Sequence, residues 1–360
     1  MFVTLTKDFM VDPKLDMDVD LEGKTDKFTL FGKEYQMYSD DWKHHVHLKC
    51  TNRCDADCAF CIERASRDDD EDAKAFLVSA RDVIDQLKRQ NMFRTLSVTG
   101  GEPTLFPMIQ EVVDMAAESG TTLFSMNSNG AKMLDLRPGS LDGWLNLSKH
   151  DVVDTDVFRR TRLIGPPHIR MFKAMQPKAR VRVQCVIGTS PRMLTTDDIL
   201  DFIGYFRRSA DDFSFRSLIV ENEWNNIPPL FTAFRKMLFD DHCCIEQTVQ
   251  DYYVYETFER DGVKITLSWS NMYLLRRFNE THEDMNFLEE IIVHPDGKVT
   301  GSWNKKTLVI HEPERPAAKA EHKSKCESCK WRHNGCRYEA SGCGTPPSAG
   351  CGSGPAYGGC

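Results

Sequence analysis

Apolar and polar positions follow two alternating patterns between residue 44 and about residue 220. Short runs rich in β-branched and aromatic residues predict strands. These strands cover residues 44–49, 94–99, 121–126, 144–148, 181–187 and 213–220. Between them, apolar residues recur at spacings of three and four, which predicts amphipathic helices. These helices cover residues 73–90, 108–119, 169–175 and 196–208. Alternating strands and helices predict an α/β fold built on a parallel sheet.

The pattern changes on both sides of this segment. Residues 1–43 are acidic and mixed, with a short hairpin expected around residues 27–35. Beyond residue 222 we expect a helix and then a strand, at residues 229–239 and 263–267. Pro295-Asp296-Gly297 separates two β-branched runs, which predicts a hairpin turn. The chain is therefore divided into an N-terminal segment, a strand–helix unit, a connecting region and a Cys-rich end: 1–43, 44–222, 223–325 and 326–360.

Composition narrows the class of protein. The chain has 360 residues, of which 41% are hydrophobic, enough for a sizeable core. No stretch approaches the roughly 20 apolar residues of a membrane span. The net charge of −8 argues against a nucleic-acid partner, because nothing would neutralise a phosphate backbone. The first residues lack the basic and apolar pattern of a signal peptide, so we expect a cytoplasmic protein without a membrane partner.

Cysteine is abundant and unevenly distributed. Of 13 Cys residues, four lie between residues 50 and 61 and six between residues 326 and 360. A cytosolic protein keeps its thiols reduced, so grouped cysteines favour metal binding over disulfides. We interpret the scattered Cys185, Cys243 and Cys244 as small buried hydrophobic side chains.

The first cysteine group follows the strand at residues 44–49. Cys54, Cys58 and Cys61 have the spacing C-x3-C-x2-C. Three thiolates on one loop can hold three corners of a 4Fe–4S cluster and leave the fourth iron without a protein ligand. An open metal position can bind a substrate or cofactor. A disulfide framework and a structural zinc site are the alternatives, and Cys50 is a second possible first ligand.

A second motif, Gly100-Gly101-Glu102-Pro103, follows the strand at residues 94–99. Two glycines allow the backbone to approach a ligand closely, and the carboxylate of Glu102 can balance an ammonium group. The alternative is an ordinary Gly-Gly turn before a helix that Thr104 caps.

Together, the two motifs resemble those of the radical S-adenosylmethionine (SAM) superfamily. The cysteine spacing, with Phe60 before the last Cys, is similar to that family's cluster-binding loop, and residues 100–103 resemble its GGEP motif. The resemblance implies a partial (β/α)6 barrel, similar to part of a TIM barrel. It also implies a 4Fe–4S cluster whose fourth iron chelates the amino and carboxylate groups of SAM. Because residues 51–53 match the family's usual lead-in, the resemblance favours Cys54 over Cys50.

The same resemblance implies that residues at the strand ends contact SAM. Phe60 would lie near the adenine, and Gly100, Gly101, Glu102 and Pro103 at the amino group. Asn127, Asn129 and Ser148 would lie near the ribose or carboxylate. For these three polar residues, capping of a turn is the alternative. We expect Lys149 and His150, which follow Ser148, to form a solvated charge pair at the strand end.

The second cysteine group resembles the SPASM and twitch extensions of radical SAM enzymes, which carry auxiliary iron–sulfur clusters. A Pro-Asp-Gly hairpin precedes C-x2-C-x6-C, as it does there. The expected ligands are Cys326, Cys329 and Cys336, with a fourth from Cys343, Cys351 or Cys360. Ser302 stands near a place where these extensions usually have a Cys, so we expect one auxiliary cluster rather than two. Zinc, which four thiolates also suit, and a metal-free tail are the alternatives.

The resemblance implies an enzyme that reductively cleaves SAM to a 5′-deoxyadenosyl radical. SPASM-type extensions accompany peptide-modifying members, so we expect hydrogen abstraction from a peptide or protein. The product would be a crosslink, a thioether, an epimerised residue or an oxidised one. An external donor such as flavodoxin or ferredoxin would supply the electron. Two alternatives are a radical SAM enzyme on a small molecule, similar to the molybdopterin-forming cyclases, and a non-catalytic Fe–S or zinc protein.

Overall fold

A computed structural model describes most of the strand–helix unit and parts of its flanks. The described residues are 2–5, 25–38, 45–61, 64, 70–153, 164–217, 228–241, 244–250, 253–270, 286–288, 290–301 and 308–313. Contacts divide the chain into a unit of residues 1–314 and a second of residues 315–360. All described residues belong to the first unit. The predicted auxiliary cluster and its six cysteines lie outside the described residues.

Six parallel strands form the centre of one sheet and pair in chain order. They are β4 (His45–Lys49), β5 (Thr95–Thr99), β6 (Leu123–Ser128), β7 (Gly143–Ser148), β8 (Ala179–Val186) and β9 (Asp212–Arg216). Each coincides, within a few residues, with a strand expected from the sequence. The α/β class with a parallel sheet is therefore confirmed.

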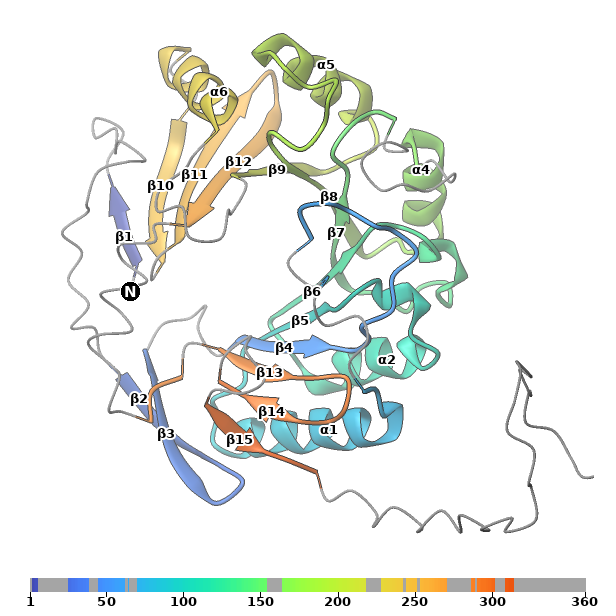
Figure 1. Ribbon diagram of the computed structural model, residues 1–360, viewed down its shortest axis with the longest axis vertical. Helices are drawn as coiled ribbons and strands as arrows, with labels where there is room; N and C mark the ends of the chain where they lie inside the picture. The colour runs from blue at the N-terminus through green and yellow to red at the C-terminus, as the bar shows by residue number, and fades with distance from the viewer. Residues whose placement is uncertain are drawn as a thin grey trace, which may run out of the picture. The chain divides into compact units, whose positions relative to one another are not determined.

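The helices lie along the outer side of this curved sheet (Figure 1). They are α1 (Ala73–Arg89), α2 (Ile109–Ser119), α4 (Pro166–Met175), α5 (Thr196–Phe206) and α6 (Pro229–Asp240). Two short 3-10 helices, η2 (Pro103–Leu105) and η3 (Met133–Asp135), follow β5 and β6. Asp72 explains where α1 begins. Its side chain caps the helix by accepting hydrogen bonds from the backbone N–H groups of Lys74 and Ala75. The expected helices are confirmed.

The sheet continues past both ends of the parallel block. β12 (Val263–Ser270) pairs parallel to β9, and β11 (Tyr253–Arg260), β10 (Cys244–Gln250) and β1 (Phe2–Leu5) follow in antiparallel order. On the other side, β13 (Ile291–Val293) pairs parallel to β4, and β14 (Val299–Thr300) and β15 (Val309–His311) follow antiparallel. Parts of the expected connecting region thus belong to the same 13-stranded sheet.

Both expected hairpins are present. β2 (Thr25–Leu30) and β3 (Lys33–Tyr38) form a separate two-stranded sheet around Phe31 and Gly32. The Pro-Asp-Gly turn joins β13 to β14 and packs against the start of α1. There, a Cβ atom on Gly297 would lie 2.8 Å from the carbonyl carbon of Ala75, and Asp72 N donates to Pro295 O at 2.8 Å. This contact requires a glycine at the turn.

The two faces of the parallel strands differ in polarity. Toward the helices, the strands present buried apolar side chains that form much of the main core. They include Val46, Leu48, Leu96, Val98, Met126, Leu145, Leu147, Val181, Val183, Phe213 and Phe215. The helices contribute residues such as Phe76, Ile84 and Phe202 to the same core. The period-two alternation of the strands therefore matches the side on which the helices pack.

The inner face of the sheet is polar. Its register places polar residues side by side, in the pairs His47–Ser97, Asn127–Asn146 and Arg182–Asp212. Asn146 Nδ2 donates to Asn127 Oδ1 at 3.1 Å, and Asn127 Nδ2 donates to Ser97 Oγ at 3.3 Å. In closed barrels of eight strands this interior is filled by branched apolar side chains. Here it offers hydrogen-bonding groups instead.

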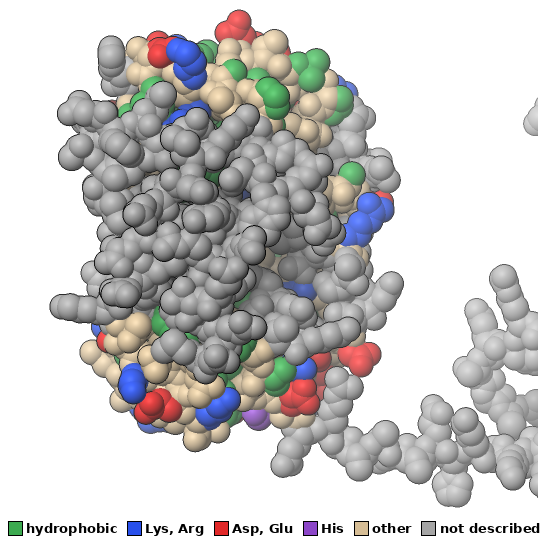
Figure 2. All heavy atoms as spheres, turned by 60° about the vertical axis from the view of Figure 1, so that its left-hand side comes forward, with side chains coloured by type: hydrophobic (Ala, Val, Ile, Leu, Met, Phe, Trp, Pro, Cys, Tyr) green, Lys and Arg blue, Asp and Glu red, His purple; other side chains and the backbone are tan. Residues whose placement is uncertain are grey.

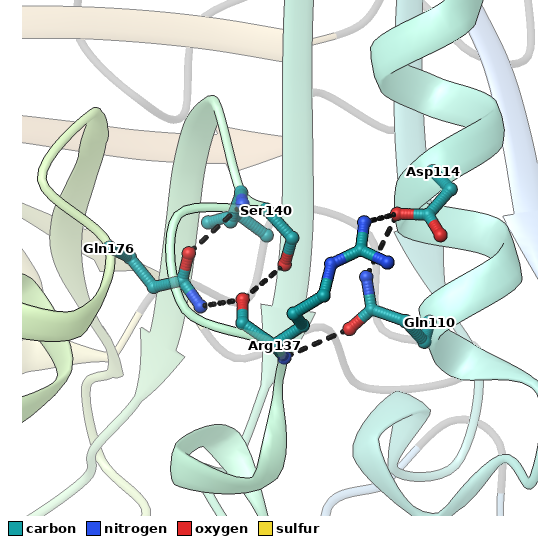
Figure 3. A network of polar contacts seen from close by, with 6 residues as sticks. Gln110, Asp114, Arg137, Ser140 and Gln176 are labelled. Atoms are coloured by element: carbon teal, nitrogen blue, oxygen red, sulfur yellow. Dashed lines mark hydrogen bonds and ion pairs between the residues drawn. The ribbon is translucent and has the colours of Figure 1, made fainter.

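The connection from β6 to β7 contains only η3 and is fixed by a side-chain network between α2 and α4 (Figure 3). The guanidinium group of Arg137 pairs with Asp114 at 2.6 Å. The backbone N of Arg137 donates to Gln110 Oε1 at 2.9 Å. Its carbonyl accepts from Gln176 Nε2 at 2.9 Å and from Ser140 Oγ at 2.6 Å. These bonds fix the β6–β7 connection between α2 and α4.

No described helix is long and apolar enough to span a membrane. On the face turned forward in Figure 2, Lys and Arg side chains lie among Asp and Glu side chains over the described surface.

Candidate active site

The three cysteines of the first motif lie on the loop that leaves the carboxyl end of β4. Cys58 is buried, and Cys54 and Cys61 are partly buried. With Ala56 and Phe60 they form a small packed group of their own, separate from the main core. The loop thus places three cysteines and one aromatic ring at the carboxyl edge of the sheet.

Cys50 has a different environment from these three. It is fully buried in the main core, and its thiol donates to Thr99 O at 3.4 Å. Burial raises the pKa of Cys50 well above its ordinary value, and the nearby Glu102 carboxylate adds to this. A protonated thiol turned into the core is a poor metal ligand, which favours Cys54 as the first ligand. Cys185 is also buried, as expected, and Cys244 is partly exposed.

The cysteine loop fits a 4Fe–4S cluster by its donor set. Besides the three sulfurs, the Cys54 Sγ atom accepts N–H groups from Ala56 N at 3.4 Å and from Asn129 Nδ2 at 3.8 Å. Such hydrogen bonds to thiolate sulfur are a recurring feature of iron–sulfur sites. Within the described part of the chain, no three Cys, His, Asp or Glu side chains converge as they would around one metal ion. Cysteines that bind different irons of a cluster are spread more widely than ligands of a single ion.

The second motif lies directly against the cysteine loop. Gly101 N donates to Thr51 O, and Glu102 N donates to Arg53 O, both at 2.7 Å. A Cβ atom on Gly100 would lie 2.4 Å from Thr51 O, and one on Gly101 would lie 2.3 Å from Arg53 O. The φ of Gly100 is +144°, which other residues rarely adopt. Both glycines are therefore required by the close approach of two backbone segments.

The Glu102 carboxylate is fully buried and links the end of β5 to the end of β6 by hydrogen bonds. Its Oε1 atom accepts from Thr104 N (3.1 Å), Thr104 Oγ1 (2.6 Å) and Ser128 Oγ (2.6 Å). Its Oε2 atom accepts from Asn129 N at 2.6 Å. Burial raises the pKa of Glu102, while the hydrogen bonds from Ser128, Thr104 and Asn129 lower it. The residue that caps η2 is Glu102, not Thr104. A contact between this side chain and SAM remains a prediction.

Phe60 packs edge-on against His150, with 4.8 Å between the ring centres. His150 Nδ1 accepts a hydrogen bond from Val186 N at 3.0 Å. Burial, with a contribution from Lys149, lowers the pKa of His150 to about 3, so the imidazole is neutral. The two side chains therefore form an uncharged aromatic surface beside the cysteine loop.

The expectation of a solvated Lys149–His150 pair is wrong, because both side chains are buried. Lys149 N donates to Gln184 O at 2.8 Å, which extends the pairing of β7 with β8 by one residue. Its Nζ atom lies 5.7 Å from the centre of the Phe206 ring. The aliphatic stem of a lysine can bury itself while its ammonium group contacts an aromatic face.

The three polar residues assigned to SAM take different positions. The Asn129 side chain faces the cysteine loop and donates to Asp55 Oδ1 at 2.8 Å. Asn127 belongs to the polar inner face, where it contacts Ser97 and Asn146. Ser148 is the last residue of β7 and is partly exposed. The structure thus brings Asn129 to the cysteines but places Asn127 away from them, deeper along the strand.

A family model described as "Radical SAM superfamily" matches residues 48–149. The match begins in β4, ends directly after β7, and includes both motifs. The chain carries a radical SAM domain. The expected resemblance to that superfamily is therefore confirmed over these residues.

Two curated proteins resemble part of this chain. A "Probable GTP 3',8-cyclase" of Sulfolobus acidocaldarius is 29% identical over 117 residues, which is 32% of this chain and 36% of that protein. "Uncharacterized protein MJ0907" of Methanocaldococcus jannaschii is 31% identical over 118 residues, which is 29% of this chain and 40% of that protein. The match spans two fifths of these relatives or less.

Two solved structures share a distant likeness. "Structure of TYW1 with a lysine-pyruvate adduct bound" has a TM-score of 0.41 and 14% identity, over 61% of this chain and 77% of that one. "Native anSMEcpe with bound AdoMet" has a TM-score of 0.44 and 15% identity, over 72% of this chain and 73% of that one. Nothing about activity follows from likenesses this distant.

One residue that holds the cysteine loop was not identified from the sequence. Glu71 lies just before α1, and its Oε1 atom accepts from Thr51 Oγ1 at 2.9 Å and from Asn52 N at 2.5 Å. Its Oε2 atom pairs with Arg53 Nε at 3.4 Å. The loop entry is thus fixed from the α1 side by Glu71 and from the β5 side by the glycine motif. An acidic residue before a helix cap is too common in sequences to reveal this role.

Proposed function

We propose that Cys54, Cys58 and Cys61 hold a 4Fe–4S cluster, and that the enzyme reductively cleaves SAM and abstracts a hydrogen atom from its substrate. The observation that carries the proposal is the direct hydrogen bonding of the glycine motif to the cysteine loop at one edge of the sheet. When bound, the cluster supplies the electron that splits SAM into methionine and a 5′-deoxyadenosyl radical.

The residues around the loop support this function by shaping one site. Gly100 and Gly101 allow the backbone of their motif to lie directly against the cysteine loop. Because the Glu102 carboxylate already accepts four hydrogen bonds, we assign the SAM amino group to the backbone of this motif. The neutral surface of Phe60 and His150 suits an adenine ring, which favours aromatic neighbours. Ser148, the last residue of β7, remains our candidate for a contact with the ribose or carboxylate of SAM.

For the substrate, we propose a peptide or protein first. The support is the resemblance of the Cys-rich end to SPASM and twitch extensions, which accompany peptide-modifying enzymes. An auxiliary cluster there, and electron supply by a flavodoxin or ferredoxin, belong to the same proposal.

A small polar molecule is the second candidate, and a specific observation favours it. The inner face of the sheet carries the polar pairs around Asn127, Asn146 and Arg182, which suit a ligand rich in hydrogen-bonding groups. One relative of the chain is named a probable GTP 3',8-cyclase. The Arg182–Asp212 ion pair at 3.0 Å would lie among the contacts of such a ligand.

The test of SAM cleavage uses the full chain, reconstituted anaerobically with iron and sulfide. With SAM and dithionite, the proposal predicts release of 5′-deoxyadenosine and methionine in equal amounts. The Cys58→Ala variant should release neither. Absence of the nucleoside from the reconstituted wild-type protein contradicts the proposal.

A second experiment separates the substrate classes. Cell extract is divided by size, and each fraction is tested for stimulation of 5′-deoxyadenosine release. Stimulation that protease treatment destroys supports a peptide or protein. Stimulation by a protease-resistant fraction of low mass supports a small molecule and contradicts the first candidate.

A further inference from the structure

Asn129 follows β6 directly, and its side chain reaches across to the cysteine loop. Its Nδ2 atom donates to Asp55 Oδ1 at 2.8 Å and to Cys54 Sγ at 3.8 Å. Its Oδ1 atom accepts from Ala131 N at 2.9 Å. A backbone N–H can only donate, so the contact with Ala131 decides which side of the amide carries oxygen. The NH2 group must therefore face Asp55 and Cys54.

The position of this amide is set independently of the cysteine loop. Asn129 N donates to Glu102 Oε2 at 2.6 Å, and the preceding Ser128 donates to Oε1 of the same carboxylate at 2.6 Å. Glu102 is fully buried, and Asn129 is only 7% exposed. The carboxylate at the end of β5 thus fixes the backbone at the end of β6, and the side chain projects from a rigid base.

We propose that Asn129 is a positioning residue that fixes the Cys54 sulfur and raises the reduction potential of the cluster on this loop. The inference rests on the proposed function. Reduction adds negative charge to a cluster, and hydrogen bonds to its sulfurs stabilise that charge. Ala56 N supplies one such bond from within the loop. Asn129 supplies another from a neighbouring strand, so it also ties the loop to the sheet.

The test is an EPR-monitored redox titration of the reconstituted full chain without SAM. The signal of this cluster is the one that Cys54→Ala removes. Asn129→Ala removes the donor, and Asn129→Asp replaces it with a carboxylate oxygen while keeping an acceptor for Ala131 N. The expected midpoint potential is highest in the wild type, lower in Asn129→Ala and lowest in Asn129→Asp.

Asn127→Ala is the matched control, because it removes the other asparagine amide of this segment, which bonds to Ser97 and Asn146 and not to the loop. Its midpoint potential should equal that of the wild type. Equal potentials in the wild type and the Asn129 variants overturn the inference, as does an equal fall in Asn127→Ala. If Asn129→Asp does not fold, the comparison of wild type, Asn129→Ala and Asn127→Ala decides.

Iron content gives a second measurement. The positioning role is supported if Asn129→Ala loses iron while Asn127→Ala stays fully loaded. Both variants should then unfold at the same temperature. A wild-type protein that binds no iron defeats the proposed function itself. A wild-type protein that binds iron and cleaves SAM, with unchanged potentials in the variants, defeats only this inference.

Discussion

Cys50 and Cys54 lie four residues apart but have opposite surroundings. Cys50 is packed in the core and donates its thiol hydrogen to Thr99 O, whereas Cys54 accepts hydrogen bonds in the loop. A thiolate ligand needs neighbours that stabilise negative charge. Ala56 and Asn129 donate to Cys54, whereas burial and the nearby Glu102 raise the pKa of Cys50. At the scale of single residues, burial and hydrogen bonding therefore separate a ligand from a core side chain that sequence alone leaves as an alternative.

This difference predicts opposite effects of two alanine substitutions. Cys54→Ala should prevent assembly of the cluster, because two cysteines cannot replace three. Cys50→Ala should keep the iron content of the wild type and lose about 1 kcal/mol or less of stability, since a small buried group is removed. Iron and sulfide analysis of the two variants checks this. Loss of iron in Cys50→Ala with retention in Cys54→Ala would reverse the assignment.

His150 predicts a pH dependence of stability. Its pKa is about 3 in the folded protein against 6.5 ordinarily. As the pH falls below 6.5, the unfolded chain gains a proton at this site and the folded protein does not, so stability is lost. Above that pH the effect disappears.

In the His150→Gln variant this contribution is absent, although the side-chain oxygen can still accept from Val186 N. Between pH 6.5 and pH 5 the variant should lose about 1.5 kcal/mol less unfolding free energy than the wild type. Urea unfolding of both proteins at the two pH values measures the difference. Parallel losses in the two proteins would show that His150 takes up its proton in the folded state.

At the scale of elements, the ends of three elements hold the cysteine loop, in addition to the bonds within the loop itself. Glu71 before α1, the glycine motif after β5 and Asn129 after β6 each contact it. A loop that binds a cluster must keep its ligands in place before the metal arrives, and contacts with rigid elements achieve this.

Glu71→Ala tests this support. The substitution removes the acceptor for Thr51 and Asn52, and hydrogen bonds to a charged group contribute about 1.5–3 kcal/mol. We expect the reconstituted variant to lose iron to a chelator several-fold faster than the wild type. Glu118→Ala, on the exposed side of α2, is the control and should match the wild type. Equal rates in all three proteins would remove Glu71 from the account.

The elements were predictable to different degrees. The strands and helices of residues 45–216 follow from their periodicity, because alternate strand residues and every third or fourth helix residue face the same core. The pairing of β12 with β9 and of β13 with β4 was not predictable, since it depends on contacts between distant segments. The same reason hides Glu71 and the Asn129 contact. The burial of Lys149 depends on the Phe206 ring, which lies far away in the sequence.

At the scale of the whole molecule, the chain combines a radical SAM domain with a Cys-rich end. The inner face of the sheet is polar where a closed barrel is apolar, and the proposed function uses this face for the substrate. A metal site at the six distal cysteines remains a prediction from sequence, and the metal it holds would decide whether the protein has one redox centre or two.

Iron counting tests the second centre. The wild-type protein should hold about eight irons per chain, and the Cys326→Ala, Cys329→Ala double variant about four, because each cubane contains four. The double variant should keep the EPR signal that Cys54→Ala removes. Equal iron content in wild type and double variant would exclude a distal iron–sulfur cluster, and zinc in the wild type alone would identify the competing metal.

The account depends most on an iron of the cysteine loop that is open to SAM. The most direct measurement is the EPR spectrum of the reduced, reconstituted protein before and after addition of SAM, including SAM labelled with 17O in its carboxylate. The account predicts that SAM changes the g-values of the loop cluster and that the label broadens its lines. Identical spectra with and without SAM, from a protein that contains the cluster, would contradict it.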